Sequence, residues 1–251
     1  MPKRQNYDRI YDMNISSRSS DIVKMTQILR YLLSFDDNGK MNRTKLIKLL
    51  WAADRYHMRH YGRLVSDSNY VAMKFGPVSS LALDIAQVKN DFALDEEDMK
   101  YIGYYLSADE KDTMATAASI KNDHLSETDK EALKWAWDTF GDREAFDIAN
   151  NVSHLYPEWA QFEDFFVRGG GRGRRDIDPI KFFDNPEHGD EFFSQDADQL
   201  AAARELYIDD KNALAALGTL LPRRRMVGSF TLRFRSRKIG IFWSAVSTMP
   251  L

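Results

Sequence analysis

Apolar residues recur at helical spacing in several separate stretches of this chain. Between residues 45 and 61 they fall at Leu46, Leu49, Leu50 and Ala53, three or four positions apart. This spacing places them on one face of a helix, so the segment is predicted to be an amphipathic helix with one side buried.

Capping residues mark where the helices should begin and end. Asn42 is expected to cap the first of them, and Gly62 to stop it, because a glycine just past the last turn accepts a left-handed conformation. The same signals, with Asp21, Ser126 and Asp142 as N-caps and Gly141 as a stop, predict further helices over residues 21–33, 126–140, 142–152 and 196–217.

Three shorter runs have strand-like composition. The run Tyr70–Phe75 ends at Gly76 and Pro77, where we expect a turn with positive φ at the glycine and a new helix from Val78. The runs Tyr101–Ser107 and Thr113–Ser119 are expected to join the first run in one short antiparallel sheet. The predicted fold class is therefore mainly α (α+β), a compact helical domain with a small antiparallel sheet.

Composition narrows the class of protein. A chain of 251 residues with 43% hydrophobic content is long and apolar enough to bury a core. It has no cysteine, which excludes disulfides and cysteine-built metal sites. No run approaches the ~18 apolar residues that a membrane helix needs, and no apolar segment follows the basic start. We therefore expect a cytoplasmic protein that does not bind a membrane.

The charge is distributed unevenly. The net charge is −3, but residues 222–251 hold seven basic residues and no acidic one, which leaves 28 basic and 38 acidic residues in the rest of the chain. Such an acidic body is a poor surface for nucleic acid, because affinity for the phosphate backbone comes mainly from lysine and arginine. It is better suited to a basic protein partner.

Several polar residues could suggest catalysis or metal binding. Asp54, His57 and His60 are three positions apart, a spacing that lacks the i, i+4 histidine pair of H-E-x-x-H zinc sites. We interpret them, and His154 near a helix end, as structural residues. The acidic triplet at 96–98 is interpreted as a solvated loop. No catalytic residue, metal or cofactor is predicted.

Two basic segments leave an alternative open. Residues 168–175 are rich in glycine and arginine but lack the Lys-Ser/Thr of a phosphate-binding loop, so they are interpreted as a flexible linker. Nearby phenylalanines could stack bases, although packing is their ordinary role. In the tail, Gly228–Arg237 alternates apolar and basic residues, and with Ile239–Val246 it is predicted to form a β-hairpin. A nucleic-acid-binding protein that uses 168–175 and 223–238 is the alternative function.

Longer sequence patterns resemble a known family. They are K-L-x-K-L-L-x-x-A-D at 45–54, Y-G-R at 61–63, Y-V-A-M-K-x-G-P-V at 70–78, and the segment Leu125–Trp159. Together they are similar to the Panacea family of SocA-like antitoxin domains, over roughly residues 20–165. The positions that match the recurrent residues of the family, as structural or partner-binding residues, are Asp54, Gly62, Lys74, Gly76, Pro77, Val78, Ser126, Gly141, His154 and Trp159.

The resemblance implies a function and a division of the chain. It implies an antitoxin of a toxin–antitoxin system that is not an enzyme and that neutralises a cognate toxin protein, encoded by the adjacent gene, through direct protein–protein binding. Formation of a homo-oligomer stays open. The expected parts are an N-terminal extension, the Panacea-like domain, a linker with a C-terminal helix that packs on the domain, and a basic tail, over residues 1–19, 20–165, 166–221 and 222–251.

Overall fold

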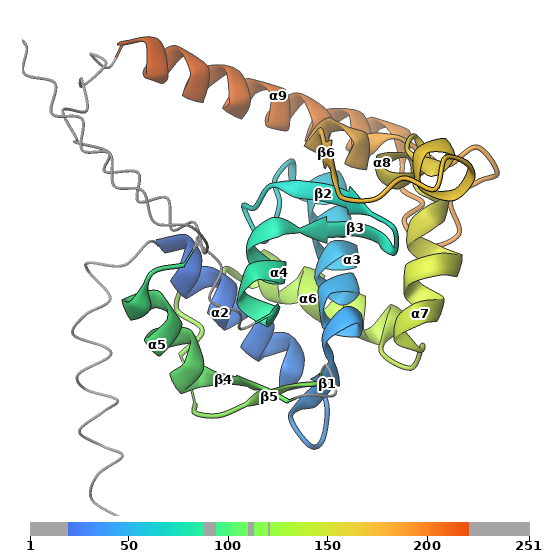
Figure 1. Cartoon of the computed structure of the whole chain (residues 1–251). Helices are drawn as coiled ribbons and strands as arrows, with labels where there is room; N and C mark the ends of the chain where they lie inside the picture. Colours follow the sequence, from blue (N-terminus) through green and yellow to red (C-terminus); the bar gives the residue numbers. More distant parts are fainter. Residues whose placement is uncertain (1–19, 88–93, 110–112, 120, 221–251) are drawn as a thin grey trace, which may run out of the picture. The chain divides into compact units, whose positions relative to one another are not determined.

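The computed structural model describes residues 20–87, 94–109, 113–119 and 121–220 (Figure 1). The described residues up to Asn212 belong to one compact unit, and the end of the last helix belongs to a second unit. The elements in chain order are α2 (Ser20–Leu33), β1 (Lys40–Asn42), α3 (Arg43–Tyr61), β2 (Tyr70–Met73), β3 (Gly76–Ser79), α4 (Ser80–Gln87), α5 (Glu96–Tyr105), β4 (Leu106–Ala108), β5 (Thr113–Thr116), α6 (Glu127–Phe140), α7 (Ala145–Asp147), the π-helix η2 (Ile148–Val152), the 3₁₀ helix η3 (Ser153–Leu155), α8 (Pro157–Ala160), the π-helix η4 (Asp164–Arg168), β6 (Arg175–Ile177), the 3₁₀ helix η5 (Pro179–Phe183) and α9 (Ala197–Leu220). The mainly α (α+β) fold class is confirmed, whereas the N-terminal extension and the predicted hairpin of the tail lie outside the described residues.

Helix α3 lies at the centre of this unit and packs against α2, α6 and β3. It begins where the sequence predicts, because the side chain of Asn42 accepts hydrogen bonds from the backbone N–H groups of Thr44 and Lys45. It ends at Gly62, which has φ of 70°. A Cβ at Gly62 would lie 2.6 Å from the carbonyl oxygen of Ala203 in α9, so this position is closely packed as well as left-handed.

Helix α6 has both predicted boundaries. Ser126 and Asp129 form a capping box, and the helix ends at Gly141. The prediction that Asp142 caps the next helix is wrong. Gly141 keeps a right-handed φ of −59°, and the N–H of Arg143 donates to the carbonyl of Phe140 in a further turn. Helix α7 therefore begins only at Ala145.

The strands form two antiparallel three-stranded sheets, in the orders β1-β5-β4 and β3-β2-β6, so the prediction of one sheet is wrong. Strands β2 and β3 form a hairpin in which Met73 lies opposite Gly76. Gly76 has the expected positive φ, at 99°. The chain does not restart as a helix at Val78, because β3 is an edge strand, where a proline is tolerated, and it continues to Ser79.

Residues 101–105 are helical, not extended as predicted. Asp95 caps α5 by accepting from the N–H of Asp98, and Tyr101 and Tyr105 lie one turn apart with their rings in contact and buried. The acidic triplet at 96–98 is accordingly the first turn of this helix and not a loop, a place where the helix dipole favours negative charge. At the start of α2, Asp21 likewise lies in the first turn instead of capping the helix.

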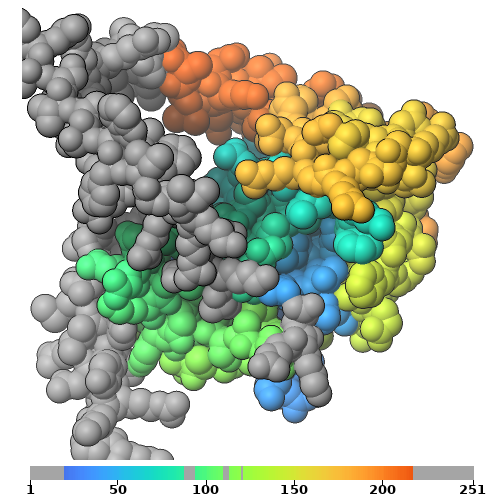
Figure 2. Space-filling view, in the orientation of Figure 1, coloured from blue at the N-terminus to red at the C-terminus, as the bar shows by residue number. Residues whose placement is uncertain are grey.

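The segment after the Panacea-like region contributes to the same fold. Strand β6 pairs with β2, with Arg175 opposite Ala72 and Ile177 opposite Tyr70. Figure 2 shows the gold surface of this segment directly against the teal β2–β3 hairpin. The phenylalanines considered for base stacking pack on the core: Phe166, Phe182 and Phe183 are buried, and Phe162 and Phe165 are partly buried.

Candidate functional site

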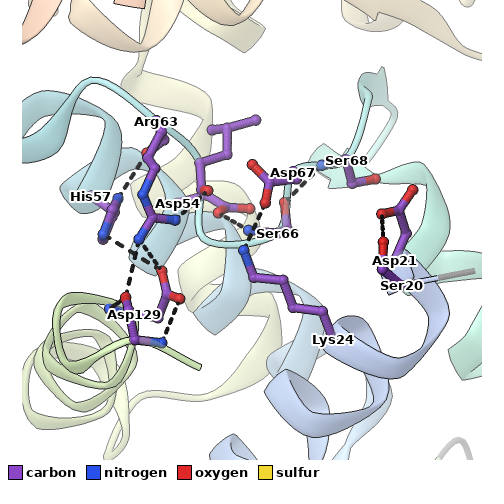
Figure 3. Close-up of polar contacts among 12 residues, drawn as sticks. Ser20, Asp21, Lys24, Asp54, His57, Arg63, Ser66, Asp67, Ser68 and Asp129 are labelled. Atoms are coloured by element: carbon purple, nitrogen blue, oxygen red, sulfur yellow. Dashed lines mark hydrogen bonds and ion pairs between the residues drawn. The ribbon is translucent and has the colours of Figure 1, made fainter. Parts of the chain in front are cut away.

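Asp54 holds the turn that follows α3. Its side chain is fully buried and accepts hydrogen bonds from the N–H of Ser66 at 2.8 Å and from the hydroxyl of Tyr70 at 2.6 Å. Burial raises the pKa of Asp54 to about 6, although both hydrogen bonds act in the opposite direction. Figure 3 shows this carboxylate pointing at Ser66, and the arrangement ties residues 62–70 to the helix.

His57 links the end of α3 to the start of α6. Its Nδ1 lies 2.8 Å from the carbonyl oxygen of Arg63, to which it donates, and its Nε2 accepts from the hydroxyl of Thr128 at 3.0 Å. Burial lowers the pKa of His57 to about 4, so the ring is neutral at pH 7. Arg63 pairs with Asp129 at 2.9 Å beside it (Figure 3).

His60 faces a different environment from His57. It bonds the carbonyl of Tyr56 at 2.8 Å and stacks on the ring of that residue. Asp54, His57 and His60 therefore do not converge on one point. Within the described ranges, no three histidine, aspartate or glutamate side chains are grouped so that they could hold a metal ion.

Two buried arginines of α3 were not singled out by sequence reasoning. Arg55 pairs with Glu158 of α8 at 2.6 Å, and both side chains have no exposed surface. Trp51 donates its indole N–H to the other carboxylate oxygen of Glu158 at 2.9 Å, and Arg55 also donates to the carbonyl of Asp184 at 2.7 Å. These contacts join α3 to α8 and to the segment that follows η5.

Arg59 extends the same attachment one turn further along the helix. Its guanidinium donates to the carbonyl oxygens of Phe183 at 3.0 Å and Phe193 at 3.1 Å, and to the side chain of Asn185 at 2.7 Å. Arg55 and Arg59 are four residues apart and share a helix face with Trp51, a spacing that could have indicated an inward-facing pair. The segment 182–193 is thus held largely through its main chain.

Lys48 is also buried in α3, and it lies nearer to the N-terminal end of the helix than Arg55 and Arg59. Its ammonium group donates to the carbonyl of Pro77 at 2.7 Å, and burial lowers its pKa well below the usual value. A Cβ at Gly76 would lie 2.5 Å from Lys48 Nζ and 2.3 Å from the hydroxyl oxygen of Ser153. The hairpin can approach α3 and η3 this closely only because residue 76 has no side chain.

Six of the ten family-matching residues lie in or around this hairpin. Gly76 and Pro77 cover Lys48, while Trp159 donates its indole N–H to the carbonyl of Met73 at 2.8 Å, and the His154 ring stacks on Trp159 at 3.5 Å between centroids. Within the hairpin, Lys74 is exposed at the turn and Val78 is buried in β3. The other four lie elsewhere: Asp54 holds a turn, and Gly62, Ser126 and Gly141 lie at helix ends.

The position of His154 gives a prediction for acid stability. Burial, and secondarily the charge of Lys48, lower the pKa of His154 to about 4 from its ordinary 6.5. Between these pH values the unfolded chain binds more protons at this residue, so stability is lost as the pH falls below about 6.5. We expect His154→Phe, which keeps a ring against Trp159, to lose less stability than the wild type between pH 7 and pH 5. Urea denaturation at both pH values measures the free energy of unfolding of each protein. An equal loss of this free energy in the variant and the wild type between pH 7 and pH 5 would contradict the prediction.

Two surface features remain after these buried contacts. A cleft of about 820 Å³ is lined by residues of η3, α8 and the segment 186–191. Separately, Phe75 at the hairpin turn and Phe146 of α7 are 48% and 56% exposed, and their rings pack edge to face at 5.7 Å. The two rings together form a small exposed apolar surface at this place.

The fold and these contacts define a mainly helical α+β domain in which buried charges join separate segments to one central helix. Residues 46–160 match the family described as Antitoxin SocA-like, Panacea domain. The resemblance stated from the sequence is confirmed. The family indicates an antitoxin role, and its domains are generally not enzymes. Comparison with curated proteins and with solved structures gives no match.

A separate finding concerns membranes. In the part of the chain that the structure describes, no helix combines the length and the apolar character needed to cross a bilayer.

Proposed function

We propose that this protein is an antitoxin that neutralises a cognate toxin protein by binding it directly. The observation that carries the proposal is the family match over residues 46–160, which includes most of α3, the β2–β3 hairpin and α6. The toxin is the product of the adjacent gene, and the complex forms in the cytoplasm. The proposal involves no catalytic activity and no cofactor.

The exposed aromatic pair supports a role in protein binding. Phe75 and Phe146 come from separate elements within the family match, and each keeps about half of its surface exposed. Aromatic side chains supply a large share of binding energy at protein interfaces. Lys74 lies 5.7 Å from the Phe75 ring and adds a positive charge beside the pair. We therefore assign this pair to the contact with the toxin.

Co-expression tests the proposal. Cells that express the neighbouring gene alone are expected to stop growing, and the wild-type chain should restore growth and form an isolable complex. The double variant Phe75→Ala/Phe146→Ala should weaken the complex by about tenfold or more, because interface aromatics contribute strongly. The matched control is Leu206→Ala/Ile208→Ala, which removes two exposed apolar side chains from α9.

Two results would count against this function. One is a neighbouring product that is harmless or that does not bind the chain. The other is steeply salt-dependent binding of RNA or DNA with no effect on the toxin, which would favour the nucleic-acid alternative. Equal weakening by the aromatic and control variants would reject the assigned surface while leaving the antitoxin role in place.

A further inference from the structure

The cleft of about 820 Å³ combines apolar and acidic lining residues. Leu155, which is 53% exposed, and Pro157 give it apolar surface, whereas Glu163, Glu187 and Glu191 bring exposed carboxylates from two different segments. Pockets of roughly 300–1,000 Å³ are large enough to enclose a ligand of some size. The lining therefore suits a ligand that is both apolar and positively charged.

The three glutamates of the cleft are not paired with basic side chains of the described residues. Among the described residues, Glu163, Glu187 and Glu191 form no ion pair, and the one lysine of the lining, Lys181, pairs with Asp184 at 3.0 Å. His154 lines the cleft as a neutral ring at pH 7, because burial lowers its pKa to about 4. The three carboxylates are thus available to a cation from outside.

Asp190 also lines the cleft, but its charge is paired within the fold. Its side chain is only 6% exposed, and one carboxylate oxygen accepts from the hydroxyl of Tyr156 at 3.0 Å and from the N–H of Phe193 at 2.8 Å. The other oxygen is buried without a hydrogen bond and lies 3.6 Å from the Arg59 guanidinium. Asp190 therefore belongs to the attachment of this segment to α3, and the exposed negative charge of the cleft comes from Glu163, Glu187 and Glu191.

We propose that this cleft binds a basic, partly apolar segment of the partner protein. Arginine or lysine side chains of that segment pair with Glu163, Glu187 and Glu191, while its apolar side chains lie on Leu155 and Pro157. The identity of the partner as the toxin rests on the proposed function, but the chemistry of the cleft does not. Charge complementarity of this kind selects the partner and its orientation.

A synthetic peptide tests the cleft without the toxin. The probe is a fluorescein-labelled ten-residue peptide of alternating arginine and leucine, titrated with the full chain, and its counterpart alternates glutamate and leucine. We expect the basic peptide to bind and the acidic one not to bind. The triple variant Glu163→Lys/Glu187→Lys/Glu191→Lys should weaken binding by about tenfold or more, because like charges now face each other.

The matched control changes the net charge equally at another place. Glu205, Asp209 and Asp210 are exposed on α9, and their replacement by lysine should weaken peptide binding by less than about twofold, since exposed charges far from a contact are screened. Melting temperatures of both triple variants should equal that of the wild type. Equal weakening by the two variants, or no binding of the basic peptide by the wild type, would overturn the proposal.

The same variants are then titrated with the neighbouring gene product. Loss of toxin binding in the cleft variant alone supports docking of a basic toxin segment in the cleft. Undiminished toxin binding by this variant would overturn that docking. Failure of the wild type to bind the product at all would reject the proposed function, and the peptide titration would still decide whether the cleft binds basic segments.

Discussion

Replacing Arg55 with methionine is expected to lower the free energy of unfolding by about 3–5 kcal/mol, because one member of a fully buried ion pair is lost and the other remains. Glu158 would keep its hydrogen bond from Trp51 but lose its only ion-pair partner among the described residues. Arg55 also contacts the ring of Tyr156 at 4.2 Å and the carbonyl of Asp184, and both contacts would disappear. Urea denaturation followed by circular dichroism measures the change.

Two companion variants and a change of pH separate charge from packing. Arg143→Met removes a partly exposed pair with Asp147 and should cost less than about 1 kcal/mol. Adding Glu158→Gln to Arg55→Met should restore part of the stability, because the unpaired charge is gone. Burial already raises the pKa of Glu158, so the cost of Arg55→Met should be smaller at pH 5 than at pH 8, where the carboxylate must be charged. A double variant less stable than Arg55→Met would contradict this account.

Replacing Gly76 with alanine is expected to cost about 2–4 kcal/mol, since the residue has φ of 99° and the new methyl group overlaps two neighbours. The added Cβ would displace Lys48 from the carbonyl of Pro77 and press on the Ser153 hydroxyl, which itself donates to the carbonyl of Ala149. Valine, with a branched Cβ, should be worse. Thermal and urea melts of the purified variants measure the effect.

Gly103 provides the matched control for this substitution. It lies in α5, where a Cβ would meet no atom within 4 Å, so Gly103→Ala should be neutral or stabilising by up to about 1 kcal/mol. If Gly76→Ala were as stable as Gly103→Ala, the close approach of the hairpin to α3 would not be a feature of the folded protein in solution.

Local signals predicted much of the fold. The ends of α3 and the start of α6 follow from short-range chemistry, in which Asn42 and Ser126 satisfy backbone N–H groups within their own first turns, and Gly62 adopts a left-handed conformation. The positive φ of Gly76 follows equally from its place in a tight turn. In each of these cases the interacting groups are only a few residues apart along the chain.

Long-range pairing could not be predicted in the same way. The helix at residues 101–105 is a different case, because local composition was misleading there: the aromatic residues favour a strand, yet the contact of Tyr101 with Tyr105 and the cap at Asp95 favour a helix. Strand β6 follows a glycine-rich run and pairs with β2, about a hundred residues earlier. The cleft unites residues 154–163 with 181–191, whose meeting depends on tertiary contacts.

Charged residues within α3 were the least predictable part of the site. Periodicity assigns apolar residues to the buried face and charged residues to the solvent, but Lys48, Arg55 and Arg59 are all buried. Their partners are a carboxylate and several carbonyl oxygens in segments far away in sequence, and only the folded arrangement identifies them.

The arginines of α3 hold the wall of the cleft by its main chain. Arg59 contacts the carbonyl oxygens of Phe182, Phe183 and Phe193, and these acceptors are present whatever side chains stand between them. The exposed residues Glu187, His188 and Glu191 can consequently change their charge, size and hydrophobicity without loosening these attachments, whereas the side chain of Asp190 is only 6% exposed and pairs with Arg59. A fixed scaffold with an interchangeable recognition segment offers one physical route by which a single antitoxin architecture could acquire different partners.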